Sequence, residues 1–561
     1  MITRIAVVLT YFIVIVLIGL MARTSWKSSP DNYFLADRKL GTVLLLGTMV
    51  ATNFSAFTFF GASGAGYRDG YAFFPIMGFG TGFMALSFWV LGRKIRHLGR
   101  RHNAITPAEL VSAMYGSPVL SLLFALVMIA FTIPYLALQP MAAGYALEEL
   151  LGLPYLWGCS IVTAIIVLYT LCGGMKAVVW TDLFQGTFMA VLLLVALGTV
   201  ASYHGGFINA NREVMASNPQ LFSRPGGAGT YTIGIWFSYI LLWFLCDPMF
   251  PQLFQRFLSA KNERAISRTM LLYPLICTVI FFLPVSMGVL GHLSFPGLTD
   301  AQSDRIVPMM LNAISGDFMA SLVVAAALAA LMSTMDSQLL TLSSIFSRDI
   351  LPLFGKRTRH SSLAGHGFVV VLAAAGLLLA FKPPSTILQL ATQTFSGLAV
   401  LFPTVLFGLY FKRVFSLPAI LSIICGEFTL FIFHMRWLST TMVLPVIWVM
   451  LVAFSIYLLT HLVMAGHSGA LTIRTPAWLR NTHFYLMAGI FVMAMDFWNW
   501  GKTLPTFIGI PAWIWYFVGL SALLTLAMFH LVRSKPLISP RCPDDHTPNL
   551  PDMPAKNRRA N

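Results

Sequence analysis

Long apolar runs recur from one end of the chain to the other, and each is long enough to cross a bilayer core as a helix of roughly 17 to 25 residues. Only 10% of the 561 residues are charged, whereas a soluble domain carries about 25%. We therefore predict an all-α polytopic membrane protein.

The runs divide into about fifteen predicted spans, which begin near residues 4, 41, 72, 117, 153, 178, 231, 268, 319, 365, 386, 416, 437, 484 and 512. The first span has no cleavage site after it, so we expect a retained helix and not a signal peptide. With the N-terminus outside and the C-terminus cytoplasmic, 28 of the 36 Lys and Arg residues fall on the cytoplasmic side, as the positive-inside rule expects. We therefore expect a multi-pass protein of a cell membrane, typical of the bacterial inner membrane. The net charge of +16 is attributed to this topology and not to nucleic-acid binding.

Motifs for metal binding or catalysis do not stand out. The six cysteines are scattered, and neither CxxC nor HExxH occurs. No set of nucleophile, base and oxyanion donors is recognisable, so we expect neither an enzyme nor an organic cofactor. The expected partners are a small solute, an ion and the lipid bilayer, with no obligatory protein partner.

Two predicted spans are interrupted in the middle by polar residues or proline. The second carries Asn53 and Thr58, and the seventh breaks at Asp247-Pro248 and again at Pro251. Paired interruptions in corresponding helices of two halves are the best sequence indication of a transporter site. Kinked helices also occur in receptors and channels, so this pattern alone leaves those classes open. We predict a first helix with a cytoplasmic loop (1–40), two core repeats (41–204 and 205–415), additional helices (416–533) and a disordered tail (534–561).

The ninth predicted span carries a polar stripe. At 100° per residue, one stripe about 100° wide contains Ala330, Ser333, Thr334, Ser337, Thr341 and Ser344. Hydroxyl oxygens that face a broken helix with free carbonyls suit a weakly bound cation such as sodium. Small and hydroxyl residues also line ordinary helix contacts, so the stripe alone leaves both interpretations open.

Five segments resemble the solute:sodium symporter family. The sodium-site helix of that family resembles AALMSTMDSQLL (329–340), and other family segments resemble DNYFLADRKLG (31–41), GGMKAVVWTDLFQG (173–186), PQLFQRFLSAKN (251–262) and QTFSG (393–397). The segments occur in the family's order over roughly residues 4 to 415. The resemblance implies a leucine-transporter-like fold with an inverted five-plus-five helix core. It also implies a sodium site formed by the carbonyls of Ala51, Phe54 and Ala330 and the hydroxyls of Ser333 and Thr334.

The acidic residues within or close to the predicted spans include Asp182, Asp247, Asp336 and Asp496. The resemblance links Asp182 to ion release and, with Ser337, to a second sodium, whereas Thr181 or Asp182 could instead cap a helix, with Lys176 as counter-charge. Asp336 lies off the stripe and either sets the local potential, pairs with a partner elsewhere in the chain, binds a proton or makes a buried hydrogen bond. Asp247 either caps a helix before Pro248 or meets a substrate cation. We have no functional account of Asp496.

Polar residues of the second, fourth, seventh and eleventh spans are the candidates for solute binding, namely Asn53, Thr58, Gln139, Asp247 and Gln393. The positions of Asn53 and Gln393 bind sugar in sugar-transporting relatives, but the acidic residues that assist there are replaced by Phe57 and Thr58. No Lys or Arg lies in the middle of these spans, although half-helix N-termini could hold a carboxylate. A small organic acid, amino acid or similar metabolite is therefore expected in preference to a sugar.

The predicted function is sodium-coupled import of a small organic solute by alternating access, with one or two sodium ions. Two other classes remain. A proton-coupled carrier would use Asp182, Asp336 or Asp247. A membrane solute sensor built on the same core is disfavoured, because only about 28 residues follow the last span.

Overall fold

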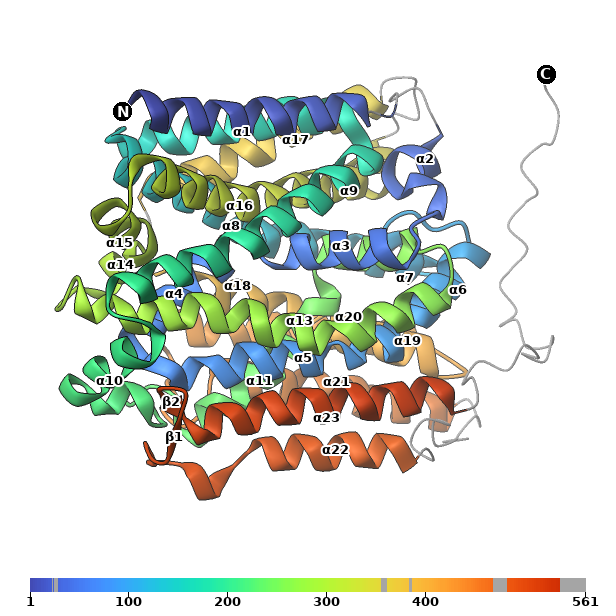
Figure 1. The fold of residues 1–561 in the computed structure, drawn as a ribbon. Helices are drawn as coiled ribbons and strands as arrows, with labels where there is room; N and C mark the ends of the chain where they lie inside the picture. Colours follow the sequence, from blue (N-terminus) through green and yellow to red (C-terminus); the bar gives the residue numbers. More distant parts are fainter. Residues whose placement is uncertain (23, 25–28, 355–360, 383–385, 468–481, 535–561) are drawn as a thin grey trace.

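The computed structural model describes residues 1–22, 24, 29–354, 361–382, 386–467 and 482–534, so the predicted tail lies outside the described residues from 535 on. Its long helices run side by side as one bundle, with α1 and α17 at one edge and α22 and α23 at the opposite edge (Figure 1). The helices and the single hairpin are α1 (Ile2–Met21), α2 (Pro30–Leu35), α3 (Thr42–Asn53), α4 (Ala62–Asp69), α5 (Thr81–Met84), α6 (Arg93–Arg101), α7 (Pro107–Tyr115), α8 (Pro118–Leu151), α9 (Tyr155–Tyr203), α10 (Phe207–Ser217), α11 (Ile233–Cys246), α12 (Pro251–Ser259), α13 (Glu263–Leu290), α14 (Asp300–Ser303), α15 (Ile306–Ile314), α16 (Asp317–Ile345), α17 (Ser361–Ala380), α18 (Ile387–Ala399), α19 (Phe402–Tyr410), α20 (Ser416–His434), α21 (Pro445–His467), α22 (Thr482–Ala494), α23 (Ala512–Arg533), β1 (Thr506–Phe507) and β2 (Ile510–Pro511).

Among the described residues, ten helices are long and apolar enough to cross a membrane, or up to twelve if each of two bent pairs is one span. The prediction of a polytopic helical protein is confirmed, whereas the count of fifteen spans stays a prediction. The structure has fewer membrane-crossing helices than the fifteen predicted spans because some predicted spans are too short to cross a membrane and others join into one helix. The apolar segment Ala364–Ala380 and α22 are short, and α9 continues for 49 residues through two predicted spans.

Helix α9 changes direction at Gly174, which explains how one helix replaces two predicted spans. Gly174 has φ +66 and ψ −175 inside the helix, a backbone conformation that residues other than glycine rarely adopt. A Cβ at this position would lie 3.0 Å from the carbonyl oxygen of Tyr33, so space as well as φ requires glycine.

The two interrupted spans are broken helices in the structure. Helix α3 and the segment Phe57–Phe73 meet at a bend of 58°, and Ile233–Met249 meets α12 at 54°. In the first, Phe54 leaves helical geometry with φ −87 and ψ 88. In the second, Pro248 and Pro251 remove backbone donors that a continuous helix needs. These breaks place polar backbone deep inside the bundle.

Helix α16 lies at the centre of the protein. It contacts α1, α3, α8, α9 and α12, and every residue from 323 to 345 is buried. A helix surrounded by protein on all sides has no lipid-facing surface, and its polar side chains can therefore all meet partners on neighbouring helices. The predicted stripe is thus one polar face of the buried part of α16, whose first turn is partly exposed at Phe318.

Ion pairs and backbone contacts join helix ends as an alternating topology requires. The N-terminal ammonium group lies 3.1 Å from Asp317 at the start of α16, and Arg4 donates to the Leu150 carbonyl at the end of α8 at 2.7 Å. At the other end of the bundle, Leu40 before α3 pairs with Ala260 after α12. These contacts are consistent with loops that alternate between the two ends of the bundle. Which end faces the cytoplasm stays a prediction.

Asp496, for which the sequence offered no account, forms an ion pair with Arg224, and both side chains are fully buried. The guanidinium lies over the rings of Trp500 and Trp513, at 4.8 and 5.1 Å from their centroids. Burial lowers the pKa of Arg224 to about 10 and raises the pKa of Asp496. The pair therefore joins the loop before α11 to the segment between α22 and α23, and its role is structural.

Candidate functional site

The break after α3 lies against the hydroxyl groups of α16. The Ser333 hydroxyl donates to the Ala51 carbonyl at 2.9 Å, and the Thr334 hydroxyl donates to the Thr52 carbonyl at 3.0 Å. Both hydroxyls also contact the Ala330 carbonyl, at 3.0 and 3.3 Å. Carbonyls in the last turn of a helix lack partners inside that helix, and the negative end of the helix dipole favours a cation beside them. Several oxygen ligands suitable for a monovalent cation thus converge here.

The structure brings together four of the five residues expected at the sodium site. Phe54, the fifth, is buried at the break itself, with its N–H bonded to the Val50 carbonyl at 2.9 Å. Thr52, which the sequence did not single out, provides the carbonyl that Thr334 contacts. Any helix break exposes successive carbonyls, and sequence spacing does not show which of them turns towards α16.

A buried arginine lies next to this cluster. The Arg256 guanidinium on α12 is 3.2 Å from the Asp182 carboxylate, and both side chains are 0% exposed. It also donates to Ser337 at 2.6 Å and to the hydroxyls of Thr48 and Thr52 at 3.2 Å each. Arg256 therefore joins α12 to α3, α9 and α16 at one point.

Arg256 is one of the 28 Lys and Arg residues that the sequence assigns to cytoplasmic segments, and the structure places its side chain inside the bundle, 0% exposed. The sequence did not indicate that Arg256 is buried, because a basic residue at the end of a predicted span is usually assigned to the loop that follows. The alternative that Asp182 caps a helix also fails. Asp182 lies well inside α9, where Thr48, Thr52 and Arg256 donate to its Oδ2 atom.

Arg256 occupies the place where a second sodium was considered. Its guanidinium contacts both Asp182 and Ser337, the two residues proposed for that ion. A sodium ion between them would lie within contact distance of a like charge, which is strongly unfavourable in a buried site. Binding there requires that Arg256 first withdraw from these side chains.

Thr52 connects the two clusters. Its carbonyl accepts the Thr334 hydroxyl, while its own hydroxyl contacts Asp182 at 3.2 Å and Ser337 at 3.1 Å. Movement of α3 at this residue therefore changes both the oxygen cluster and the Arg256 contacts. Asp336 lies next to this cluster, close enough to interact with Asp182, Arg256 and Ser337, and accepts a hydrogen bond from Tyr169 of α9 at 3.0 Å.

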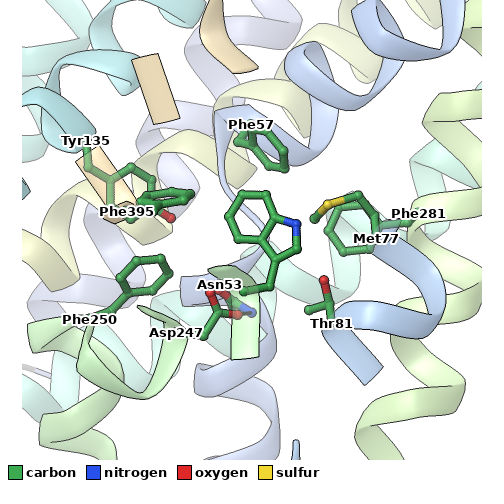
Figure 2. A pocket seen from close by; sticks show the side chains of 10 residues that line it. Asn53, Phe57, Met77, Thr81, Tyr135, Asp247, Phe250, Phe281 and Phe395 are labelled. Carbon is green, nitrogen blue, oxygen red and sulfur yellow. Dashed lines mark hydrogen bonds between the residues drawn. The ribbon is translucent and has the colours of Figure 1, made fainter. Parts of the chain in front are cut away.

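A small cavity lies beside the two breaks, and Figure 2 shows the side chains around it. Its lining is mostly aromatic, with Asn53 and Asp247 next to each other on one side and Thr81 nearby. The residues that line it are Asn53, Phe57, Met77, Thr81, Tyr135, Trp243, Asp247, Phe250, Phe281 and Phe395. Drug-sized ligands occupy pockets of about 300–1,000 Å³, and the space left between these side chains is far smaller.

Two of the five residues expected at the solute site, Asn53 and Asp247, line the cavity. The Asp247 carboxylate accepts from Asn53 Nδ2 and from Cys246 Sγ, both at 3.4 Å. Those contacts leave the carboxylate beside the cavity and not at a backbone N–H, which favours the binding interpretation over the cap. Asn53 also donates to the Tyr273 hydroxyl at 2.8 Å.

Thr58, Gln139 and Gln393 are not among the residues that line this cavity. The Gln139 side chain accepts from the Ala56 N–H at 3.2 Å and so satisfies the broken backbone. Gln393 is exposed on α18, and Thr58 is buried. Most of the rest of the lining is aromatic, and sequence reasoning missed it because apolar side chains in spans are normally attributed to lipid or core contacts.

A family model described as the sodium:solute symporter family matches residues 33–426. The chain belongs to the sodium:solute symporter family. Among its relatives, the sodium/pantothenate symporter of Escherichia coli (strain K12) is 30% identical over 413 residues, which cover 72% of this chain and 85% of the relative. The high-affinity proline transporter PutP of Bacillus subtilis (strain 168) is 28% identical over 423 residues, which cover 73% and 88%.

The predicted leucine-transporter-like fold is confirmed by a solved structure of a Na⁺-coupled sialic acid symporter in a substrate-bound outward-open state. It matches with a TM-score of 0.66 at 17% identity and covers 81% of this chain and 96% of that chain. This family member is accordingly a multi-pass, sodium-coupled transporter and not an enzyme. The relatives do not determine its solute.

Proposed function

We propose that this symporter imports a small organic solute with sodium bound among the oxygens of Ala51, Phe54, Ala330, Ser333 and Thr334. The observation that carries the proposal is the convergence of the Ser333 and Thr334 hydroxyls on backbone carbonyls at the α3 break. A sodium ion between these oxygens replaces hydrogen bonds that now join α3 to α16. Hydroxyl and carbonyl oxygens without a carboxylate give the moderate affinity that a released ion requires.

Sodium binding in this place stabilises the break, because each of its ligands comes from α3, its extension or α16. The solute cavity begins at Asn53, next to the proposed ligands. An ordered break therefore fixes one wall of the cavity, and sodium raises solute affinity. By linkage, the solute raises sodium affinity by the same factor. The membrane potential adds about 2.3 kcal/mol per charge per 100 mV to inward movement.

The Arg256 cluster is proposed to close the path between the sodium site and the end of the bundle that holds Leu40 and Ala260. Its contacts join both broken helices to α9 and α16. Release of sodium towards that end, which the charge distribution assigns to the cytoplasm, needs these contacts to separate. The core repeats 41–204 and 205–415 would then move relative to each other.

The test is uptake into proteoliposomes with an inward gradient of sodium or of potassium, measured for a panel of small solutes. Sodium-dependent uptake that the membrane potential accelerates is expected. Uptake that ignores sodium and follows a proton gradient would replace this proposal with the proton-coupled alternative.

A further inference from the structure

The solute cavity contains one carboxylate and no basic side chain. Asp247 is 2% exposed, and its contact with Asn53 Nδ2 at 3.4 Å is longer than the 2.7–3.2 Å of ordinary N–H···O hydrogen bonds. Its other donor is the Cys246 thiol, a weak donor. Among the described residues that line the cavity there is no Lys, Arg or His. A buried carboxylate without a cationic partner is costly, and a cationic ligand removes that cost.

Five aromatic rings form a continuous wall opposite and around this carboxylate. The ring centroids of Phe57 and Trp243 are 5.5 Å apart, and those of Trp243 and Phe395 are 5.1 Å apart. Phe250 and Tyr135 continue the wall at 4.7 and 4.8 Å from Phe395. We call these five residues the aromatic cage. Aromatic faces attract ammonium groups within about 6 Å, and methylated ammonium groups are commonly bound in such cages.

An anionic solute would need hydrogen-bond donors at the cavity, and the backbone N–H groups after the α3 break already have partners. The Ala56 N–H donates to Gln139, and the Phe57 N–H donates to the Ser55 hydroxyl at 3.2 Å, so both first amides after the α3 break already have partners. Helix α12 begins with Pro251, which has no N–H. The first two amides of the α3 extension are therefore not free to bind a carboxylate, and α12 lacks a donor at its first position.

Two further groups at the cavity can bind a second part of a ligand. The Trp243 indole N–H and the Thr81 hydroxyl line the cavity, are buried, and have no hydrogen-bond partner among the described residues. An indole N–H can only donate, so its partner must carry an acceptor oxygen. A ligand that joins a cation to such an oxygen satisfies the carboxylate, the cage and these two groups together.

We propose that the solute of this symporter carries an ammonium group, held between the Asp247 carboxylate and the aromatic cage, with an oxygen acceptor that reaches Trp243 and Thr81. The proposal rests on the proposed function of sodium-coupled import and specifies its substrate class. The close spacing of the lining side chains limits the solute to a small molecule, and these side chains must move apart to admit it.

The test compares probes of matched shape on the purified full-length protein. Choline carries a trimethylammonium group and a hydroxyl, tetramethylammonium lacks the hydroxyl, ethanolamine carries a primary ammonium, and 3,3-dimethylbutan-1-ol is the neutral isostere of choline. Melting temperature is recorded for each probe in NaCl and in KCl at equal ionic strength, because a ligand of the native state raises it by mass action. At least one ammonium probe should raise it, more in NaCl than in KCl, while the neutral isostere should not.

Two variants locate the binding groups. Asp247→Asn keeps shape and removes charge, and it should weaken the binding ammonium probe at least about tenfold while the melting temperature still rises in sodium. Trp243→Phe keeps the aromatic face and removes the N–H, so it should weaken choline relative to tetramethylammonium. Equal stabilisation by choline and its neutral isostere, or unchanged ammonium affinity in folded Asp247→Asn, overturns the proposal.

The outcomes for the two proposals are separate. Stabilisation by sodium without selectivity for any ammonium probe overturns the substrate class alone. Melting temperatures that are equal in NaCl and KCl, with and without every probe, contradict sodium coupling itself. The comparison of choline with its isostere uses the unaltered chain and therefore stands even if Asp247→Asn does not fold.

Discussion

The ion pair between Arg256 and Asp182 gives the sharpest test of the structure, because both charges are 0% exposed. Replacing Asp182 with Asn leaves a buried guanidinium without its counter-charge, which costs about 3–5 kcal/mol. With roughly 2.1 cal/mol/K of unfolding entropy per residue, a chain of 561 residues changes by about 1.2 kcal/mol for each degree, so Tm should fall by about 3–4 °C. Arg256→Met should lower Tm by a similar amount, because it leaves the Asp182 carboxylate buried without its positively charged partner.

The double variant decides between a coupled pair and two independent losses. When both charges are replaced, neither leaves an unpaired charge buried. The double variant Asp182→Asn, Arg256→Met should therefore recover most of the Tm that each single variant loses. The assay is thermal unfolding of purified protein followed by tryptophan fluorescence. The matched control is Glu148→Gln, which breaks the exposed Arg305–Glu148 pair of 2.6 Å and should cost no more than about 1 kcal/mol.

Transport measured with these variants of Asp182 and Arg256 tests whether their contacts control the release of sodium. We expect Asp182→Asn to slow turnover more than it weakens solute binding, because the residue lies away from the solute cavity. A double variant as unstable as the sum of its two single variants would refute the reasoning on stability. Wild-type turnover in folded Asp182→Asn would refute the role in ion release.

Three further outcomes are expected. Ser333→Ala removes a hydroxyl that contacts α3 and should raise the sodium concentration for half-maximal uptake about tenfold; unchanged sodium dependence in folded protein would count against the proposed ligand set. Arg224→Met should lower Tm by several degrees and should be rescued by Asp496→Asn, with sodium dependence unaffected; altered sodium dependence would contradict a purely structural pair. Gly288→Ala should strongly reduce folded protein in a detergent-extraction assay, because its Cβ would lie 2.1 Å from the Ser63 carbonyl oxygen; normal expression and Tm would show that α4 and α13 can separate.

The sequence was sufficient for the features that depend on local composition and spacing. Apolar runs predict helices in lipid because no other local structure satisfies the backbone there. Prolines near residue 248 predicted one break, the hydroxyl stripe predicted the polar face of α16, and family segments predicted the fold that the comparisons confirm. Each of these signals is contained within one turn or one span of the chain.

The tertiary structure alone decided which distant groups meet. Arg256 looked like a loop charge until α12 placed it against Asp182, 74 residues away in the sequence. The aromatic cage combines residues of α8, α11 and α18 with others next to the two breaks, and no pattern within any one span distinguishes them from lipid-facing rings. Helical periodicity fixes which face a side chain occupies, whereas the partner of that face is fixed by packing of the whole bundle. A buried charge or a cavity is therefore a property of several helices together and cannot be read from one of them.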